Sequence, residues 1–215
     1  SNPPPSQCTR TGDGPLVFGH RGARGHAPEN TLLGIETGIR LGADWIEVDV
    51  HLNAGNPVLM HDLTLDRTTN GRGFVADVPP DYLAELDAGR GQKVPSVLDA
   101  IDMIDRRAGL NLELKSAGSA AVVVREIRHA VQLLGWDWSA FLLSSFHLQE
   151  LRPLLALDPP LPISALYARV PLPYAPSPHS LRSFSLPLSP LFLSPLLLPS
   201  PLSFSLLFSL SLLFF

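Results

Sequence analysis

The stretch from Trp45 to Asp62 reads Trp-Ile-Glu-Val-Asp-Val-His-Leu-Asn-Ala-Gly-Asn-Pro-Val-Leu-Met-His-Asp. Its first half is typical of a strand, because apolar and β-branched residues alternate with Glu47 and Asp49. The two-residue period of a strand places both carboxylates on one face. Burying two acids costs several kcal/mol unless a cation compensates them, and a hard divalent cation does so for adjacent carboxylates. The pattern therefore predicts a metal site, and the alternative is a solvated strand face opposite a basic neighbour.

A short turn at residues 53–56 separates this strand from a second apolar run, Pro57 to Met60. Four residues are too few for a helical crossover, which needs about a dozen. We therefore predict a hairpin over residues 50–60, with its turn centred between Ala54 and Gly55. In this register Asp49 lies across from Met60, and His61 follows next to the carboxylates.

Strand-like runs alternate with helical patterns along residues 16–166. The predicted strands are 16–19 (buried), 46–52, 57–60, 111–115, 140–144 and 163–166. The predicted helices include one capped by Asn30, one from Val97 to Arg107 closed by Gly109, one at 120–134 and one at 148–157. This alternation predicts an α/β fold with a parallel sheet covered on both faces. Because the early strands end in charged residues, a closed barrel would bring those residues together at one mouth.

The charged residues at these strand ends suit a phosphoryl group. Arg21 offers two parallel donors to phosphate oxygens, and Lys115 offers a second positive charge. Glu47, Asp49 and Glu113 supply oxygen ligands for Mg²⁺ or Ca²⁺. Glu113 and Lys115 could instead form a plain exposed pair. The sequence has no Gly-rich phosphate loop or dinucleotide fingerprint, which argues against transfer from a nucleotide and favours phosphodiester hydrolysis.

Two histidines are candidates for general acid and base, because imidazole titrates near neutrality. They are His20 and His61, each at the end of a predicted strand. A lone histidine at a strand end is more often structural, so the prediction rests on the charged residues that accompany both histidines. His51 shares the strand face of Glu47 and Asp49, which leaves a supporting role for it open.

Several segments of the chain resemble the glycerophosphodiester phosphodiesterase family in order and spacing. They are His20-Arg-Gly22 with Pro28-Glu-Asn-Thr31, Glu47-Val-Asp-Val50, Pro57-Val-Leu-Met-His-Asp62, Leu65-Asp-Arg-Thr-Thr-Asn-Gly71, Leu86-Asp-Ala-Gly89, Val94-Pro-Ser-Val-Leu98, Leu112-Glu-Leu-Lys115 and Leu143-Ser-Ser-Phe146. The resemblance covers about residues 16–168. It implies a distorted TIM (β/α)8-type barrel that hydrolyses glycerophosphodiesters to sn-glycerol 3-phosphate and an alcohol.

The resemblance also implies a role for each candidate residue. The positions of His20 and His61 are the acid/base pair of the family, those of Glu47, Asp49 and Glu113 hold the metal, and those of Arg21 and Lys115 hold phosphate. The family continues with two further strands whose motifs are not found here, which implies a truncated barrel. Two classes of function follow: a metal-dependent phosphodiesterase, or a non-catalytic fragment of one. A lysophospholipase D acting on acylated substrates is a third possibility within the enzyme class.

Composition divides the chain into three parts. Residues 1–14 are rich in Pro and Ser and are expected to be an irregular extension, residues 15–168 form the predicted domain, and residues 169–215 form a tail of mostly Leu, Ser, Pro and Phe. Prolines interrupt the apolar run of the tail, so we favour an out-of-frame or intron-derived origin over a membrane anchor. The net charge of −4 gives no reason to expect nucleic acid as a partner. The single Cys8 and the lack of a visible signal peptide predict a cytoplasmic location. The family resemblance implies a small-molecule glycerophosphodiester as the substrate.

Overall fold

The computed structural model describes residues 15–157 and 160–166. The extension at 1–14 and the tail at 169–215 lie outside the described residues, so the predictions about them stay predictions. Within the described part, no helix is both long enough and apolar enough to cross a membrane.

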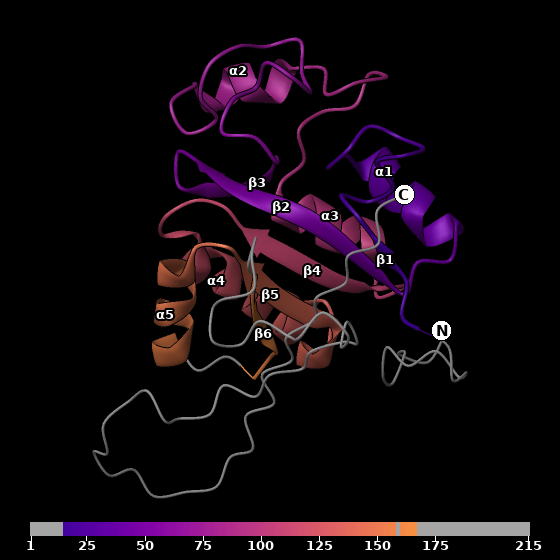
Figure 1. Cartoon of the computed structure of the whole chain (residues 1–215), viewed down its shortest axis with the longest axis vertical. Coiled ribbons are helices and arrows are strands. Elements are labelled where there is room, and N and C mark those ends of the chain that lie inside the picture. Colours follow the sequence, from indigo (N-terminus) through magenta and orange to yellow (C-terminus); the bar gives the residue numbers. More distant parts are fainter. Residues whose placement is uncertain (1–14, 158–159, 167–215) are drawn as a thin grey trace, which may run out of the picture.

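A single sheet organises the described residues (Figure 1). Its strands are β1 (Phe18–Gly19), β2 (Trp45–Asn53), β3 (Asn56–Leu59), β4 (Gly109–Leu114), β5 (Phe141–Ser145) and β6 (Ile163–Ala165). The order β1-β2-β4-β5-β6 is parallel throughout, and β3 pairs antiparallel with β2. The six predicted strands and the parallel sheet are therefore confirmed.

The hairpin of β2 and β3 has the predicted register. Val50 pairs with Leu59, and the Met60 N–H donates to the Asp49 carbonyl at 3.0 Å. The turn residues Ala54 and Gly55 have φ of 47° and 80°, which matches the right-handed twist of the flanking strands. The hairpin therefore delivers His61 to the end of β2 that carries Asp49.

The helices follow the strands in the expected alternation. They are α1 (Leu32–Arg40), α2 (Pro80–Glu85), α3 (Val97–Ile104), α4 (Ser119–Leu133) and α5 (Leu148–Leu157), with a 3₁₀ turn at Trp138–Ala140. The prediction that α3 runs to Arg107 and closes at Gly109 is wrong. This helix ends at Ile104 because Asp105 adopts a left-handed φ of 41°, and Gly109 already begins β4.

The cap of α1 is also displaced from its predicted position. Thr31, not Asn30, accepts a hydrogen bond from the Gly34 N–H and begins the helix. Asn30 has a left-handed φ of 54°, and its side chain bonds to Asp49 instead. The amide is therefore used in the candidate site rather than at the helix end.

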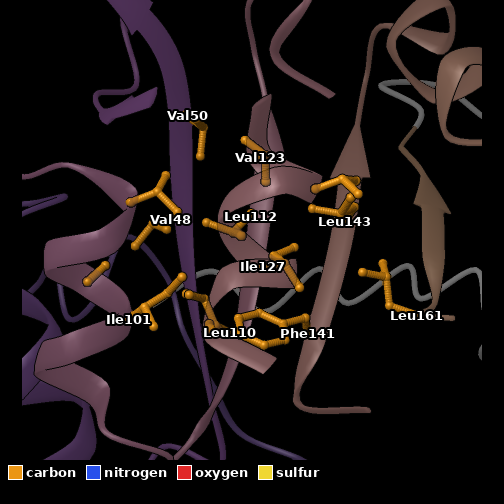
Figure 2. Packing of buried hydrophobic residues seen from close by; sticks show 14 of the residues in the cluster. Val48, Val50, Ile101, Leu110, Leu112, Val123, Ile127, Phe141, Leu143 and Leu161 are labelled. Atoms are coloured by element: carbon orange, nitrogen blue, oxygen red, sulfur yellow. The ribbon is translucent and has the colours of Figure 1, made fainter. Parts of the chain in front are cut away.

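The larger apolar cluster of the described residues lies on one face of the sheet. Val48, Val50 and Leu112 pack there against Ile101 of α3 and Ile127 of α4 (Figure 2). Alternation along β2 and β4 then turns the intervening polar residues to the opposite face. Polar side chains such as Glu47, Asp49 and Glu113 are buried on that face. In the described part of the chain the helices α3 and α4 cover the apolar face, so the prediction that helices cover both faces is confirmed for that face only.

Burial of the first strand was predicted wrongly. Leu16 and Val17 are 49% and 46% exposed, and β1 itself is only two residues long. Within the described residues β1 pairs only with β2, so it is an edge strand and its apolar residues have a neighbour on one side only.

Candidate active site at the carboxyl ends of the strands

Three carboxylates meet on the polar face of the sheet. Parallel pairing sets Asp49 of β2 opposite Glu113 of β4, and Glu47 lies two residues earlier on β2. One oxygen from each lies within 4.8 Å of the others, and all three residues are buried. The predicted ligands are therefore brought together, and the alternative of a solvated strand face is excluded.

The carboxylate of Glu47 is only half satisfied. Its Oε2 accepts from the Arg21 backbone N–H at 2.8 Å, whereas Oε1 is buried and has no hydrogen-bond partner. Burial and then the neighbouring charge of Asp49 raise the pKa of Glu47 to about 8. A buried carboxylate oxygen without a hydrogen-bond donor can serve as a cation ligand, and an all-oxygen set suits Mg²⁺ or Ca²⁺. The residues present therefore fit a divalent cation.

Lys115 is drawn into this cluster. Its Nζ lies 2.6 Å from Glu113 Oε1 and 3.1 Å from Asp49 Oδ1. Burial opposes its charge, but the carboxylates of Asp49 and Glu113 outweigh that effect and raise the pKa of Lys115. The exposed-pair interpretation of Glu113 and Lys115 is thus wrong, since both side chains are largely buried.

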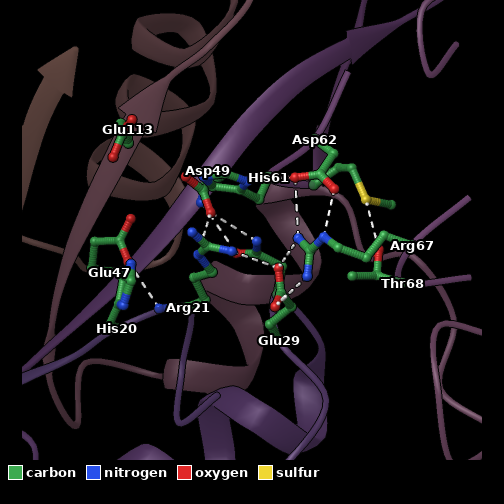
Figure 3. Close-up of polar contacts among 12 residues, drawn as sticks. His20, Arg21, Glu29, Glu47, Asp49, His61, Asp62, Arg67, Thr68 and Glu113 are labelled. Carbon is green, nitrogen blue, oxygen red and sulfur yellow. Dashed lines mark hydrogen bonds and ion pairs between the residues drawn. The ribbon is translucent and has the colours of Figure 1, made fainter. Parts of the chain in front are cut away.

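Arg21 lies on the other side of Asp49, in the loop after β1. Its Nε is 3.4 Å from Asp49 Oδ2, and its Nη1 donates to Glu29 Oε1 at 2.7 Å (Figure 3). The left-handed φ of 51° at Arg21 and the bond from its N–H to Glu47 fix the backbone here. The guanidinium therefore stays beside the carboxylate cluster, as its predicted role requires.

The two histidines lie on either side of the cluster. His20 Nε2 is 3.8 Å from Glu47 Oε2, and 57% of its side chain is exposed. Burial, followed by the charges of Arg21 and Arg24, lowers the pKa of His20. His61 Nδ1 is 2.6 Å from Asp62 Oδ1, which leaves its Nε2 as the ring atom without this partner. Both rings are accessible enough to meet a substrate.

His51 forms a hydrogen bond with the backbone of His61. The His61 carbonyl can only accept, so His51 Nε2 carries the hydrogen and donates to it at 3.2 Å. In the neutral ring Nδ1 then accepts from the Ser116 hydroxyl at 2.8 Å, and Ser116 Oγ also accepts from the Leu52 N–H at 3.2 Å. Burial lowers the pKa of His51, in keeping with this neutral form. His51 thus contacts the backbone of His61, and the supporting role that the sequence left open for it stays a prediction.

A second group of residues links the two sides of the site and was not predicted. Arg67 contacts both Glu29 and Asp62, and those two acids contact Arg21 and His61. Glu29, Asp62 and Arg67 lie within motifs on which the family resemblance rests, and this was the signal in the sequence that could have indicated them. Sequence alone gave no role for them, because their contact depends on the path of the loop after β3.

The model of the glycerophosphoryl diester phosphodiesterase family matches residues 20–187. This chain belongs to that family. The resemblance seen in the sequence is confirmed, and with it membership of a family of phosphoric diester hydrolases.

Individual relatives of this phosphodiesterase-family chain agree. A glycerophosphodiester phosphodiesterase of Caldanaerobacter subterraneus subsp. tengcongensis is 35% identical over 162 residues, which are 71% of this chain and 66% of the relative. The putative glycerophosphodiester phosphodiesterase YhdW of Bacillus subtilis is 34% identical over 160 residues, which are 70% of this chain and 65% of that relative. The chain therefore spans slightly less than two thirds of these relatives.

A solved structure gives the same result for the fold. The phosphodiesterase of Oleispira antarctica, in complex with its product sn-glycerol-3-phosphate, has a TM-score of 0.67 and 34% identity, covering 74% of this chain and 69% of that one. A glycerophosphodiester phosphodiesterase from Agrobacterium tumefaciens has a TM-score of 0.62 and 33% identity, with coverages of 69% and 65%. The expected barrel-type α/β fold is confirmed, whereas the expected loss of the last two strands concerns residues outside the described part.

Proposed function

We propose that this chain hydrolyses glycerophosphodiesters to sn-glycerol 3-phosphate and an alcohol, and that it needs Mg²⁺ or Ca²⁺. The observation that carries the proposal is the buried cluster of Glu47, Asp49 and Glu113, with one orphaned oxygen and a histidine on each side. Family membership and the product held by the Oleispira relative support the same substrate class.

The three carboxylates would hold the cation, which when bound neutralises phosphate charge and polarises the phosphorus centre. Arg21 would orient the substrate phosphate from one side of Asp49 and Lys115 from the other, since each lies beside that carboxylate. A phosphate oxygen that binds Lys115 would draw its ammonium away from Asp49 and Glu113.

Proton transfer falls to the two imidazoles. One, in its neutral form, takes the proton of the attacking water while the new P–O bond forms, and the other, in its imidazolium form, gives a proton to the leaving alcohol oxygen as the old P–O bond breaks. His61 has its Nδ1 directed to Asp62, so its Nε2 is the atom that exchanges the proton. The lowered pKa of His20 keeps that ring neutral at pH 7, as a base must be.

Release of glycerol 3-phosphate from glycerophosphocholine with added Mg²⁺ or Ca²⁺ tests the activity. We expect His20→Asn and His61→Asn to lower kcat about 100-fold or more, because each removes a proton-transfer group. His129→Asn, at an exposed position on α4, is the matched control and should be unchanged. A folded sample without activity would favour the fragment interpretation, and release of choline from lysophosphatidylcholine alone would favour acylated substrates.

The cation site can be tested without activity. Added Mg²⁺ or Ca²⁺ should raise the Tm of the wild type, since a ligand that binds only the folded state stabilises it. Asp49→Asn should abolish this rise, because it removes one ligand charge from the cluster. Replacement of Asp102, on α3 and away from the cluster, by Asn should leave it intact. An equal rise in Asp49→Asn would show that the cation binds elsewhere.

A further inference from the structure

Arg67 lies in the loop after β3 and joins two carboxylates from separate parts of the chain. Its Nε and Nη2 donate to the two oxygens of Asp62 at 2.5 Å and 3.1 Å. Its Nη1 and Nη2 donate to the two oxygens of Glu29 at 3.0 Å and 2.7 Å (Figure 3). One guanidinium thus binds two carboxylates, each through both of its oxygens.

Each of these carboxylates also contacts a residue of the proposed site. Asp62 Oδ1 lies 2.6 Å from His61 Nδ1, and Glu29 Oε1 accepts from Arg21 Nη1 at 2.7 Å. A continuous path of charged hydrogen bonds therefore runs from His61 through Asp62, Arg67 and Glu29 to Arg21. It connects a proton-transfer group with a phosphate-orienting group.

Arg67 is poorly placed to bind phosphate itself. A guanidinium has five N–H donors, and the four hydrogen bonds to Glu29 and Asp62 use four of them. A substrate phosphate would have to displace a carboxylate to gain a forked contact. The bonds to Glu29 and Asp62 also raise the pKa of Arg67, so its charge is fixed.

We propose that Arg67 is a positioning residue that holds Asp62 against His61 and Glu29 against Arg21. This inference rests on the proposed function, since it concerns the same site. With Asp62 fixed, the His61 ring keeps its hydrogen on Nδ1 and presents Nε2 to the substrate. With Glu29 bound on two sides, its charge is compensated and does not repel an anionic substrate.

The tautomer of His61 tests the proposal whether or not the chain is active. In ¹⁵N NMR spectra of the full chain, with His61 assigned through His61→Asn, the wild-type ring should show one tautomer with hydrogen on Nδ1. In Arg67→Gln we expect a mixture of tautomers, because Asp62 loses the donor that holds it. Arg107→Gln is the matched control: Arg107 is 42% exposed against 48% for Arg67 and also binds a carboxylate, Glu36, at 2.7 Å. An unchanged tautomer in Arg67→Gln would overturn the proposal.

Kinetics give a second test that a merely structural role would not satisfy. Arg67→Gln and Asp62→Asn should each lower kcat about 10- to 100-fold. Because both act through His61, kcat of the double variant should lie within about threefold of kcat of the less active single variant. Arg67→Lys should recover little, because an ammonium cannot bind both carboxylates through two oxygens each. Fully multiplicative effects, or recovery of wild-type kcat by lysine, would overturn the proposal. Absence of activity in the wild type would instead reject the proposed function and leave the NMR result to decide this one.

Discussion

The side-chain amide of Asn30 makes two hydrogen bonds to Asp49 and so fixes the direction of that carboxylate. Its Oδ1 accepts from the Asp49 N–H at 3.1 Å, and its Nδ2 donates to Asp49 Oδ2 at 2.9 Å. Asp49 is 1% exposed, so no water is at hand to replace the amide. The left-handed φ of Asn30 is what aims the side chain there, and asparagine tolerates this conformation better than most residues.

Replacing Asn30 by Asp tests this arrangement. The substitution keeps the acceptor and the tolerance of a left-handed φ, but it removes the donor and places a negative charge beside Asp49. We expect the affinity for Mg²⁺ or Ca²⁺ to fall about 10- to 100-fold and the free energy of unfolding to fall by about 1–3 kcal/mol. Isothermal titration calorimetry and urea unfolding measure the two effects.

The control for this substitution is Asn70→Asp. Asn70 uses its Oδ1 to accept from the Asp87 N–H, an acceptor that aspartate keeps. It should bind the cation as the wild type does. Wild-type affinity in Asn30→Asp would show that the amide does not orient Asp49.

At the scale of elements, the pairing of β2 with β4 assembles the carboxylate cluster. The register begins with Trp45 opposite Gly109 and ends with Val50 opposite Leu114, which sets Asp49 opposite Glu113. Gly109 starts β4 where the Trp45 indole lies over it, so that a Cβ at this position would overlap the ring. The glycine is therefore needed for a close approach of the two strands and not for the end of a helix.

Gly109→Ala should disturb this pairing. Because the added methyl group overlaps the buried Trp45 ring, we expect the free energy of unfolding to fall by about 1–3 kcal/mol in urea titrations. Gly25→Ala is the matched control, since a Cβ there meets nothing within 4 Å. Equal stability of the two variants would mean that β2 moves to accept the methyl group at no cost.

Local patterns were enough to predict where the strands lie and which carboxylates come together. Glu47 and Asp49 are identified by alternation within one strand, and the short turn at Ala54 and Gly55 is enough to place His61. The contacts of Arg67 could not be predicted, because its partner Glu29 lies 38 residues away and is reached only through the path of a loop. Sequence periodicity describes faces of elements, whereas the direction of a loop side chain depends on packing that no local pattern encodes.

For the whole molecule, the charges of the site explain why a divalent cation fits. Five carboxylates belong to the joined networks, namely Glu29, Glu47, Asp49, Asp62 and Glu113. Three cations face them, namely Arg21, Arg67 and Lys115. When every acid is ionised, the excess is two negative charges, which one divalent cation offsets. The charges are not evenly distributed. Arg21 and Arg67 balance the charges of Glu29 and Asp62, so the two excess negative charges lie on the cluster of Glu47, Asp49 and Glu113 with Lys115.

The ion pairs of Glu29 and Asp62 should make the free energy of unfolding depend on pH below about 4.5. Burial alone would raise the pKa of Glu29, but hydrogen bonds from Arg67 and Arg21 outweigh it and lower the pKa from 4.5 to about 2. The hydrogen bond from Arg67 likewise lowers the pKa of Asp62 from 3.8. Above pH 4.5 both acids are ionised in the folded and the unfolded chain, so this stability is fully present. As the pH falls from 4.5 toward 2, the unfolded chain takes up protons first, and the stability is lost.

Urea unfolding of the wild type between pH 5 and pH 3 should therefore show a falling free energy, with a slope of at most about 1.4 kcal/mol per pH unit for each acid. In Glu29→Gln the slope should be smaller, because one of the two titrating groups is gone. Glu85→Gln should keep the wild-type slope, since the Glu85 side chain is 87% exposed and its ion pair with Lys93 is long at 3.8 Å. If Glu29→Gln and the wild type lose stability in parallel over this range, the acid sensitivity arises elsewhere and the Arg67 network does not hold Glu29 ionised.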